Sequence, residues 1–376
     1  MKKIVVASDS FKGSLSSVDV ALSAEKGVKE VFPACDVVKI NVADGGEGTV
    51  DAVVEALNGK KVRINVSNPI GEPVEAEYGV AGDTAIIEMA AASGLPLLTL
   101  EQRNPWVTST YGTGEMILDA LNRGCSKFLV GIGGSATNDA GTGMLQALGF
   151  RFYDKNDELI QDCCGGRLGD IARIDDSNVS EAVRNAEFTV ACDVDTPFCG
   201  PEGAAYVFAP QKGADADMVR RLDEGMASFA EVVNAKYNID IVPIEGAGAA
   251  GGMGGAFRAF LNATLKKGID MVLDAISFDA MNAGADLVVT GEGKVDFQTA
   301  KGKTAAGVLA RAKRVGIPVV AIGGCVEMCD SLEQMGFAGI YPILEEKVPL
   351  EIAMEHDFAS ANVTRTITRV LSQMKK

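Results

Sequence analysis

The stretch KKIVVASDSFKGSLSSVDVALSAEKGVKEVFPACDVVKINVAD, residues 2–44, decides the fold class. It opens with a short apolar run that ends in small polar residues, as a buried strand does, and continues with apolar residues at helical spacing. Ser16 or Ser17 is placed to cap that helix, and DVVKINVAD (36–44) has the pattern of a second strand. A glycine turn and another helix follow in residues 44–59. Strands that alternate with helices predict an α/β fold with a parallel sheet.

This rhythm changes near residue 60 and returns near residue 285. Residues 62–89 contain three runs of alternating polarity joined by turns, which is typical of antiparallel strands, and residues 216–237 predict a long helix. Strands and helices alternate again from ADLVVTGEG (285–293) onward. Two N-terminal and three C-terminal strands would complete one five-stranded parallel sheet. We therefore expect a doubly wound domain with a mixed α/β domain inserted into it, with the boundaries 1–62 and 285–376 for the first and 63–284 for the second.

The composition excludes several classes of function. The 376 residues include 35 Lys and Arg against 51 Asp and Glu, a net charge of −16, whereas a nucleic-acid or anionic-membrane partner requires a basic face. No apolar run reaches the roughly 18 residues of a membrane span, and the N-terminus lacks a signal-peptide pattern, so a cytoplasmic protein is expected. Eight irregularly spaced cysteines and a single histidine, His356, argue against a disulfide framework, a histidine triad or a His-ligated zinc site. The chemistry is expected to come from carboxylates, lysines and backbone amides.

Glycine accounts for 43 of the residues and gathers with polar residues in five segments at predicted strand ends. These segments are DSFKGSLSS (9–17), ADGGEGTVD (43–51), GIGGSATNDAGTG (131–143), ACDVDTPFCGPEGAAYVFAPQKGA (191–214) and TGEGKVDFQTAKGK (290–303). Ligands of open α/β sheets bind beyond the carboxyl ends of the strands, so these loops are where a site is expected.

The segment 131–143 has the features of a phosphate loop. Gly133, Gly134 and Ser135 lie between a predicted strand and a predicted helix, where exposed amides and a helix N-terminus favour an anion. The segment lacks both the Gly-Lys-Ser/Thr of a Walker A loop and a complete dinucleotide fingerprint. Close packing of the glycine turns is the alternative interpretation.

The carboxylates of two further segments are candidates for metal binding or proton transfer. Glu292 and Asp296 are suited to a divalent cation, unless they belong to a solvated charged loop. Asp193 follows an apolar strand and stands between Cys192 and Val194, where we expect a partly desolvated carboxylate that acts as a base or a magnesium ligand. An Asx-turn that leads into Pro197 is the alternative for Asp193.

A protein of this net charge that handles anions needs local positive charge. Lys12, Lys212 and Lys294 each lie in a glycine-containing loop, as that requirement predicts. Acidic loops with scattered lysines indicate a magnesium–nucleotide site, and phosphoryl transfer requires little beyond positioning and charge neutralisation.

The ordered motifs DSFKGSLSS, VADGGEGTVDA, YGTGEMI, GIGGSATNDAGTGM, ACDVDTPFCGPEGAA, FAPQKGA, GAGAAGG and VTGEGKVDFQT resemble the bacterial class-I glycerate kinase family over about residues 1–373. The chain departs from the family pattern at Thr196-Pro197-Phe198, where Asn-Pro-Leu is frequent, and at Ala140, where glycine is common. Neither departure changes a charge. The resemblance implies a flavodoxin-like domain built from both chain ends with a second α/β domain between. It also implies ATP-dependent phosphorylation of D-glycerate to 2-phosphoglycerate, in glyoxylate, glucarate or galactarate breakdown.

The chemistry of the residues suggests a role for each one. Asp193 is the expected base or metal-orienting carboxylate. The expected Mg²⁺ ligands are Glu292 and Asp296, with Asp44 and Glu47 as a second set. The expected contacts to the phosphates of ATP are the backbones of Gly133, Gly134, Ser135, Gly291 and Gly293. The residues expected to neutralise phosphate or the substrate carboxylate are Lys12, Lys212 and Lys294. The residues expected to contact glycerate are Asp9, Ser135, Asn138 and Lys294.

Competing functions stay open from the sequence. A dehydrogenase would need an acid about 20 residues past a glycine fingerprint, and Asp154 and Asp157 lie there, although on a polar turn. A non-catalytic sugar-acid sensor on the same fold is a second competing function, and a kinase that forms 3-phosphoglycerate is a third. The last helix is expected to dock its apolar face (Val363, Ile367, Val370, Leu371) on its own sheet, while monomer and homodimer both remain open.

Overall fold

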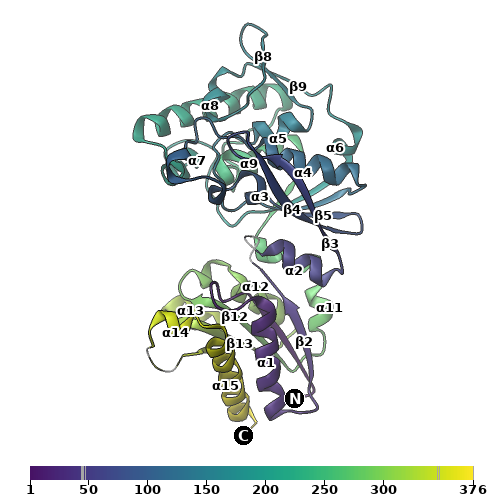
Figure 1. Ribbon diagram of the computed structural model, residues 1–376, viewed down its shortest axis with the longest axis vertical. Coiled ribbons are helices and arrows are strands. Elements are labelled where there is room, and N and C mark those ends of the chain that lie inside the picture. Colours follow the sequence, from purple (N-terminus) through teal and green to yellow (C-terminus); the bar gives the residue numbers. More distant parts are fainter. Residues whose placement is uncertain (44–45, 47, 345, 347, 376) are drawn as a thin grey trace. The chain divides into compact units, whose positions relative to one another are not determined.

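The computed structural model describes residues 1–43, 46, 48–344, 346 and 348–375 (Figure 1). Its contacts divide the chain into two units. The first comprises Met1–Asp44, Glu55–Leu57 and Val272–Lys376, and the second comprises Gly45–Val54 and Asn58–Met271.

The first unit is built on a five-stranded sheet in which every pair of neighbouring strands is parallel. Its strands are β1 (Lys3–Ser8), β2 (Asp36–Asn41), β12 (Leu287–Val295), β13 (Val319–Val326) and β14 (Gly339–Pro342). They lie in the order β14-β13-β12-β1-β2, which is the 2-1-3-4-5 order of flavodoxin-like folds when the strands are counted along the chain. The predicted parallel sheet from both chain ends is thereby confirmed.

The sheet is accompanied by helices, of which those at Ser17–Val31, Thr304–Arg314 and His356–Met374 pack on its strands. The helices are α1 (Ser17–Val31), α11 (Phe278–Asn282), α12 (Thr304–Arg314), α13 (Asp330–Met335), α14 (Leu350–Ala353) and α15 (His356–Met374), with a 3₁₀ turn η5 (Thr299–Lys301). Ser16 is the cap of α1, because its hydroxyl accepts from the Asp19 amide at 3.1 Å while its own amide donates to Asp19 Oδ2 at 3.1 Å. Val363 and Ile367 of α15 are buried in one cluster with Ile4 of β1, so the last helix docks in its own unit as predicted.

The second unit contains a mixed six-stranded sheet in the order β11-β10-β6-β5-β4-β3. Its strands are β3 (Lys60–Ser67), β4 (Pro73–Ala81), β5 (Thr84–Glu88), β6 (Lys127–Gly131), β10 (Glu187–Ala191) and β11 (Thr264–Lys266). The three strands predicted within 62–89 pair antiparallel in sequence order, and β5 continues into parallel pairing with β6. A small antiparallel sheet joins β7 (Arg151–Tyr153), β8 (Leu159–Ile160) and β9 (Arg173–Asp175).

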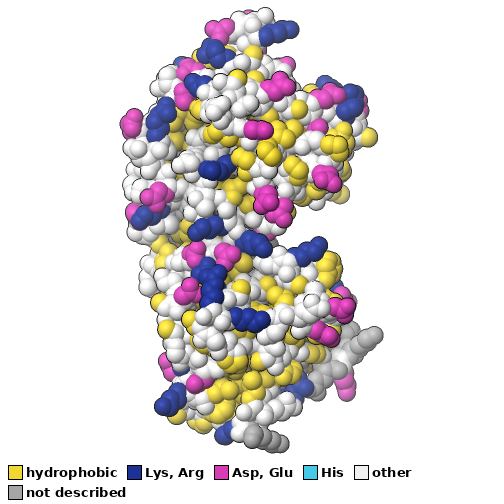
Figure 2. Space-filling view, turned by 180° about the vertical axis from the view of Figure 1, so that it is seen from behind, with side chains coloured by type: hydrophobic (Ala, Val, Ile, Leu, Met, Phe, Trp, Pro, Cys, Tyr) yellow, Lys and Arg dark blue, Asp and Glu magenta, His cyan; other side chains and the backbone are white. Residues whose placement is uncertain are grey.

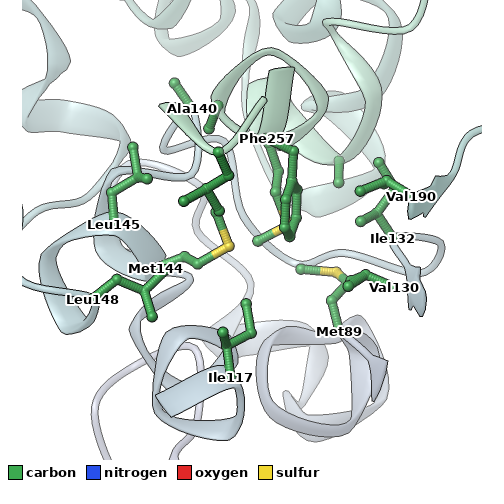
Figure 3. Close-up of a cluster of buried hydrophobic side chains, with 14 of the residues drawn as sticks. Met89, Ile117, Val130, Ile132, Ala140, Met144, Leu145, Leu148, Val190 and Phe257 are labelled. Carbon is green, nitrogen blue, oxygen red and sulfur yellow. The ribbon is translucent and has the colours of Figure 1, made fainter. Parts of the chain in front are cut away.

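The core of the second unit lies between its main sheet and its helices. The helices are α2 (Thr49–Ala56), α3 (Ala90–Ser93), α4 (Tyr111–Asn122), α5 (Thr142–Ala147), α6 (Glu181–Asn185), α7 (Ala204–Phe208), α8 (Ala216–Tyr237), α9 (Ala249–Phe260) and α10 (Gly268–Ala275), of which α2 and α10 each have residues in both units. Further 3₁₀ turns are η1 (Leu95–Leu97), η2 (Leu100–Gln102), η3 (Gly165–Asp170) and η4 (Pro210–Lys212). Val130 and Val190 of the sheet converge with Ile117, Met144 and Phe257 from three helices (Figure 3).

The surface carries both signs of charge. Acidic and basic side chains are interspersed over the face drawn in Figure 2. Across the part of the chain that the structure describes, no helix is both long and apolar enough to cross a membrane.

The contact between α1 and α15 depends on the absence of a side chain at Gly27. A Cβ there would lie 2.6 Å from the Thr364 carbonyl oxygen and 2.9 Å from Ile367 Cβ. Alanine is favoured over glycine inside a helix by about 1 kcal/mol, so propensity alone predicts that Gly27→Ala stabilises the protein. The close backbone contact outweighs propensity, and we expect a loss of about 1–3 kcal/mol in urea unfolding followed by circular dichroism. Lys26→Ala, at the exposed neighbouring position, is the control and should stay within about 0.5 kcal/mol of the parent; a Gly27→Ala variant as stable as this control would contradict the packing argument.

Candidate active site

In the first unit, the carboxyl ends of β1 and β12 meet where the strand order reverses, which is where open α/β sheets bind ligands. The Asp9 amide donates to the Gly291 carbonyl oxygen at 2.9 Å, which fixes the loop after β1 beside β12. A Cβ on Gly293 would lie 3.4 Å from the Lys12 backbone nitrogen, which shows that the loop carrying Lys12 lies beside β12. The structure thereby brings together Asp9, Lys12, Gly291 and Gly293, which the sequence placed in two distant segments.

Two carboxylates and a hydroxyl lie at the end of β12. Glu292 is 6% exposed and Asp296 is 5% exposed. The Thr299 hydroxyl donates to Glu292 Oε1 at 2.7 Å and accepts from the Asp296 amide at 3.1 Å. Burial acts to raise the pKa of Asp296, but the Gln298 amide, which donates to Oδ1 at 2.8 Å, and Lys294 outweigh it, so the pKa lies below its ordinary value. Asp296 is thus held in its anionic form.

Cationic groups surround these acids. Lys294 Nζ lies 3.2 Å from Asp296 Oδ2 and 2.9 Å from Glu327 Oε2, and hydrogen bonds to Glu327 and Asp296 raise its pKa. The N-terminus of α12 is tied to the same place, because the Thr304 hydroxyl donates to Asp9 Oδ2 at 3.0 Å. Lysines, a helix N-terminus and two carboxylates at one sheet edge form an environment for an anion together with a cation.

The sequence pattern ended this strand at Gly293 and predicted a loop at Lys294, and the structure corrects this prediction. β12 runs on to Val295, and its ladder with β13 pairs Glu292 with Gly323 and Lys294 with Cys325. Because alternate strand residues share a face, Glu292 and Lys294 lie on one face, opposite to Gly291 and Gly293. The strand backbone fixes their spacing more firmly than a loop would.

In the second unit, the segment after β6 presents exposed amides. Gly133 and Gly134 are exposed, and Gly134 has a φ of +75°, a conformation that favours glycine. The Gly134 carbonyl accepts from the Leu95 amide at 2.9 Å, and the Ala136 amide donates to the Ser93 carbonyl at 2.9 Å. Among the described residues, none accepts a hydrogen bond from the amides of Gly133 or Gly134. A loop held by its other groups, with two amides exposed, is suited to phosphate.

Lys212 supports this loop from inside the unit. The side chain is 1% exposed, and its Nζ lies 2.8 Å from Ser135 Oγ and 2.6 Å from the Thr137 carbonyl oxygen. Burial lowers the pKa of Lys212 to about 7, although the nearby Asp139 opposes this shift. The sequence predicted a lysine in contact with a ligand, whereas the structure places its amine beneath the loop.

Asp139 is a buried carboxylate that the sequence pattern did not single out. Its oxygens accept from the Thr110 amide at 2.8 Å, the Thr110 hydroxyl at 2.7 Å, and the amides of Gly141 and Gly143 at 3.2 Å each. Burial raises the pKa of this carboxyl, and these four donors oppose the shift. The sequence did contain a signal for Asp139, because it stands just before the glycines at the start of α5, where a short acidic side chain can cap a helix.

Asn138 and Ala140 flank this carboxylate and also contribute to the packing of the loop. Asn138 was expected to face glycerate, but it is fully buried and its Nδ2 donates to Met226 Sδ at 3.2 Å, so that expectation is corrected. Ala140 has a φ of +51°, in the left-handed region that costs a non-glycine residue about 1–2 kcal/mol. This conformation gives a physical reason for the glycine common there in the resembling family.

Asp193 follows β10, which pairs in parallel with β6 so that Ala191 lies opposite Gly131. The loops that carry Asp193 and Gly133 therefore leave the sheet at the same edge. Asp193 is exposed, and its Oδ1 accepts from the Gly268 amide at 2.9 Å. The expected partial desolvation of this carboxylate is wrong, because β10 ends at Ala191, before the alternation of buried positions reaches Asp193.

Candidate metal ligands are few. Asp44 and Glu47 lie outside the described residues. No group of three or more His, Cys, Asp or Glu side chains arranged for a metal ion occurs among the residues that were placed. Glu292 and Asp296 nevertheless fit Mg²⁺, which usually takes one or two carboxylates and completes its shell with water and substrate phosphates.

Comparison with known proteins gives a consistent result over the whole chain. Residues 4–375 match the glycerate kinase family. The chain is 47% identical over 376 residues to a glycerate kinase of Bacillus subtilis (strain 168), with 99% of this chain and 98% of that protein covered. It is 43% identical over 373 residues to a glycerate 2-kinase of Escherichia coli (strain K12), with 97% and 98% covered. A crystal structure assigned as glycerate kinase 2 from Salmonella typhimurium LT2 has a TM-score of 0.91 and 44% identity, with 100% of this chain and 98% of that one covered.

Thr299 offers a test of the acidic cluster that requires no assay of activity. Replacing it by valine removes the hydroxyl that joins Glu292 to the Asp296 amide but keeps the shape of the side chain. We expect Thr299→Val to lower the free energy of unfolding by about 1–3 kcal/mol, because buried polar groups lose a partner. Thr299→Ser keeps the hydroxyl and should lose less than half as much. Equal losses in the two variants would show that the methyl group, and not the hydroxyl, stabilises this turn.

Proposed function

The chain belongs to the glycerate kinase family, and from this premise we propose that it transfers the γ-phosphoryl group of ATP to the C2 hydroxyl of D-glycerate. The enzyme is a kinase that phosphorylates glycerate, with ATP as its co-substrate. The observation that carries the proposal is the family match over residues 4–375. Choice of the C2 hydroxyl is supported by the 43% identity to a glycerate 2-kinase, and a product phosphorylated at C3 is the competing outcome.

We assign the metal and charge-neutralising roles in the first unit to the residues at the ends of β1 and β12. Glu292 and Asp296 would hold Mg²⁺, which when bound neutralises charge on the phosphates. Lys12 and Lys294 neutralise phosphate or the carboxylate of glycerate, and Lys294 stays protonated because its acidic neighbours raise its pKa. Asp9, oriented by the Thr304 hydroxyl, accepts a hydrogen bond from a glycerate hydroxyl. The backbone of Gly293, which is half-buried, is assigned to the nucleotide phosphates, whereas Gly291 is buried against Ile322 of β13.

We assign phosphate binding in the second unit to the loop after β6. The exposed amides of Gly133 and Gly134 donate to phosphate oxygens, and the Ser135 hydroxyl lies at the same loop. Lys212 and Asn138 hold the loop from inside the unit. For Asp193 the sequence left two roles, base or metal-orienting carboxylate, and we assign the second, because the carboxylate is exposed and its Oδ1 is oriented by the Gly268 amide.

These groups serve a reaction whose demands are mainly electrostatic. In-line phosphoryl transfer needs the acceptor oxygen aligned with the phosphorus and the charge on the phosphoryl oxygens stabilised. Amides and lysines that are already in place stabilise the charge on the phosphoryl oxygens without reorganising. Preorganisation of this kind gives such sites most of their catalytic effect. The cytoplasmic location and the choice between monomer and homodimer stay predictions.

The reaction can be tested directly by incubating the protein with ATP, Mg²⁺ and D-glycerate and identifying the product by phosphorus NMR. We expect 2-phosphoglycerate, with ADP formed in equal amount. A 3-phosphoglycerate signal would overturn the assignment of the hydroxyl but keep the kinase. Failure with both glycerate enantiomers would contradict the substrate.

The assignment of Glu292 predicts a metal-dependent defect. Glu292→Gln keeps the shape of the side chain but removes its charge, so we expect the Mg²⁺ concentration for half-maximal turnover to rise about 10–100-fold. Glu333→Gln, which neutralises an exposed acid on α13, is the matched control and should leave the Mg²⁺ dependence within about twofold of the parent. If the two variants show the same Mg²⁺ dependence, Glu292 is not on the metal side of the site.

A further inference from the structure

We propose that Ser135 and Lys212 form the pair that takes up the proton of the glycerate hydroxyl, an inference that rests on the glycerate kinase activity proposed above. Ser135 is the residue that touches the substrate, and Lys212 is a positioning residue that acts through it. The pair lies at the end of β6, next to the amides assigned to phosphate.

The geometry of the pair suits proton transfer in one direction. Lys212 Nζ lies 2.8 Å from Ser135 Oγ and 2.6 Å from the Thr137 carbonyl oxygen. A neutral amine has two N–H donors and one lone pair. In the structure the amine donates to both Ser135 Oγ and the Thr137 carbonyl. In its neutral form one N–H keeps the bond to the Thr137 carbonyl, and the lone pair can accept the proton of the Ser135 hydroxyl. The oxygen of Ser135 is then free to accept a proton from a substrate hydroxyl.

The proton balance of the step is complete. As the glycerate oxygen attacks the γ-phosphorus, its O–H bond breaks and the proton passes to Ser135 Oγ. The original Ser135 proton passes to Lys212 Nζ, which becomes an ammonium group. The bond between the γ-phosphorus and the bridging oxygen breaks, and ADP leaves with that electron pair. The ammonium group then releases its proton to solvent, so ATP and glycerate give ADP, phosphoglycerate and one proton.

The surroundings favour a neutral amine before the reaction. Lys212 is 1% exposed, and burial lowers its pKa to about 7, so a substantial fraction is uncharged at neutral pH. Asp139 is the titratable group that faces it within the described residues; burial raises the pKa of this carboxyl, and in its anionic form it favours the ammonium form of Lys212. Burial also raises the pKa of the Cys163 and Cys164 thiols near Asp139, the latter to about 11, so these groups stay neutral in the range of the test.

Asp193 is the competing proton acceptor. Its carboxylate is exposed, and its Oδ1 accepts from the Gly268 amide at 2.9 Å. A general base is most effective when its pKa lies near the working pH, a condition that the Lys212 amine meets.

The test is the pH dependence of kcat between about pH 5.5 and 9.5 with ATP, Mg²⁺ and D-glycerate saturating. Below its pKa the amine already carries the extra proton and cannot accept another, so we expect wild-type kcat to fall about tenfold per pH unit below about pH 7. Ser135→Ala should lower kcat about 10²–10³-fold at about pH 8 and remove this acid limb. Ser135→Thr keeps the hydroxyl and should keep the limb, with kcat within about tenfold of the parent.

Two further variants separate proton transfer from support of the loop. Ser93→Ala removes a buried hydroxyl that lies 2.8 Å from the Thr113 hydroxyl, in the segment whose carbonyl holds Ala136, and it should leave the acid limb in place. Asp193→Asn should also keep the limb. The inference is overturned if Ser135→Ala lowers kcat equally at every pH, or if the limb disappears in Asp193→Asn instead. If the wild-type protein forms no phosphoglycerate at any pH, the proposed function fails first and the role of the pair fails with it.

Discussion

The parallel pairing of β1 with β12 is the contact on which the first unit depends. It places Ile4 opposite Leu287 and Ser8 opposite Gly291, although these strands lie at the two ends of the chain. Parallel strands always need a crossover connection, and in this chain the crossover contains the second unit. Each doubling of a loop costs only about 0.6 kcal/mol in closure entropy, so a long insertion is tolerated while the strand pairs keep their hydrogen bonds. Without this pairing Asp9 would have no neighbour at Gly291, and the acids and lysines would lie in separate segments.

The carboxyl ends of parallel strands carry different chemical groups in the two units. In the first, Lys12 and Lys294 are exposed, and Lys294 is paired with Asp296 and Glu327. In the second, the cationic side chain is inside, and the exposed groups are backbone amides with no charge of their own. Burial of Lys212 and Asp139 is tolerated because hydroxyls, amides and carbonyls satisfy both side chains. The loop geometry is therefore set from below and is independent of any ligand.

The sequence predicted the features that depend on local periodicity. It did not predict the features that depend on contacts between residues far apart in the chain. The five-stranded sheet, a cap at Ser16 or Ser17 and the long helix α8 followed from spacing, since strands and helices impose periods of about 2 and 3.6 residues, and the structure places the cap at Ser16. Burial could not be read in the same way: a lysine next to glycine reads as exposed, yet Lys212 is covered by a loop that comes much earlier in the chain. Asp139 was missed because its main partner, Thr110, lies 29 residues away. Candidate residues could be named in advance and stay predictions, but their burial and their partners could not be predicted.

A buried amine that is neutral before the reaction can gain a positive charge during the reaction. Lysines that carry a permanent charge cannot do this. Both substrates are anions and the chain carries a net charge of −16, so permanent cations are needed to bind them. Such cations stabilise the bound substrates and the transition state alike, and only interactions that strengthen in the transition state raise kcat. An amine that gains its charge as it takes up the proton becomes positive at the moment the acceptor oxygen forms its bond to phosphorus. Because the low-dielectric interior surrounds that new charge, it acts on the loop with less screening than a solvated lysine does.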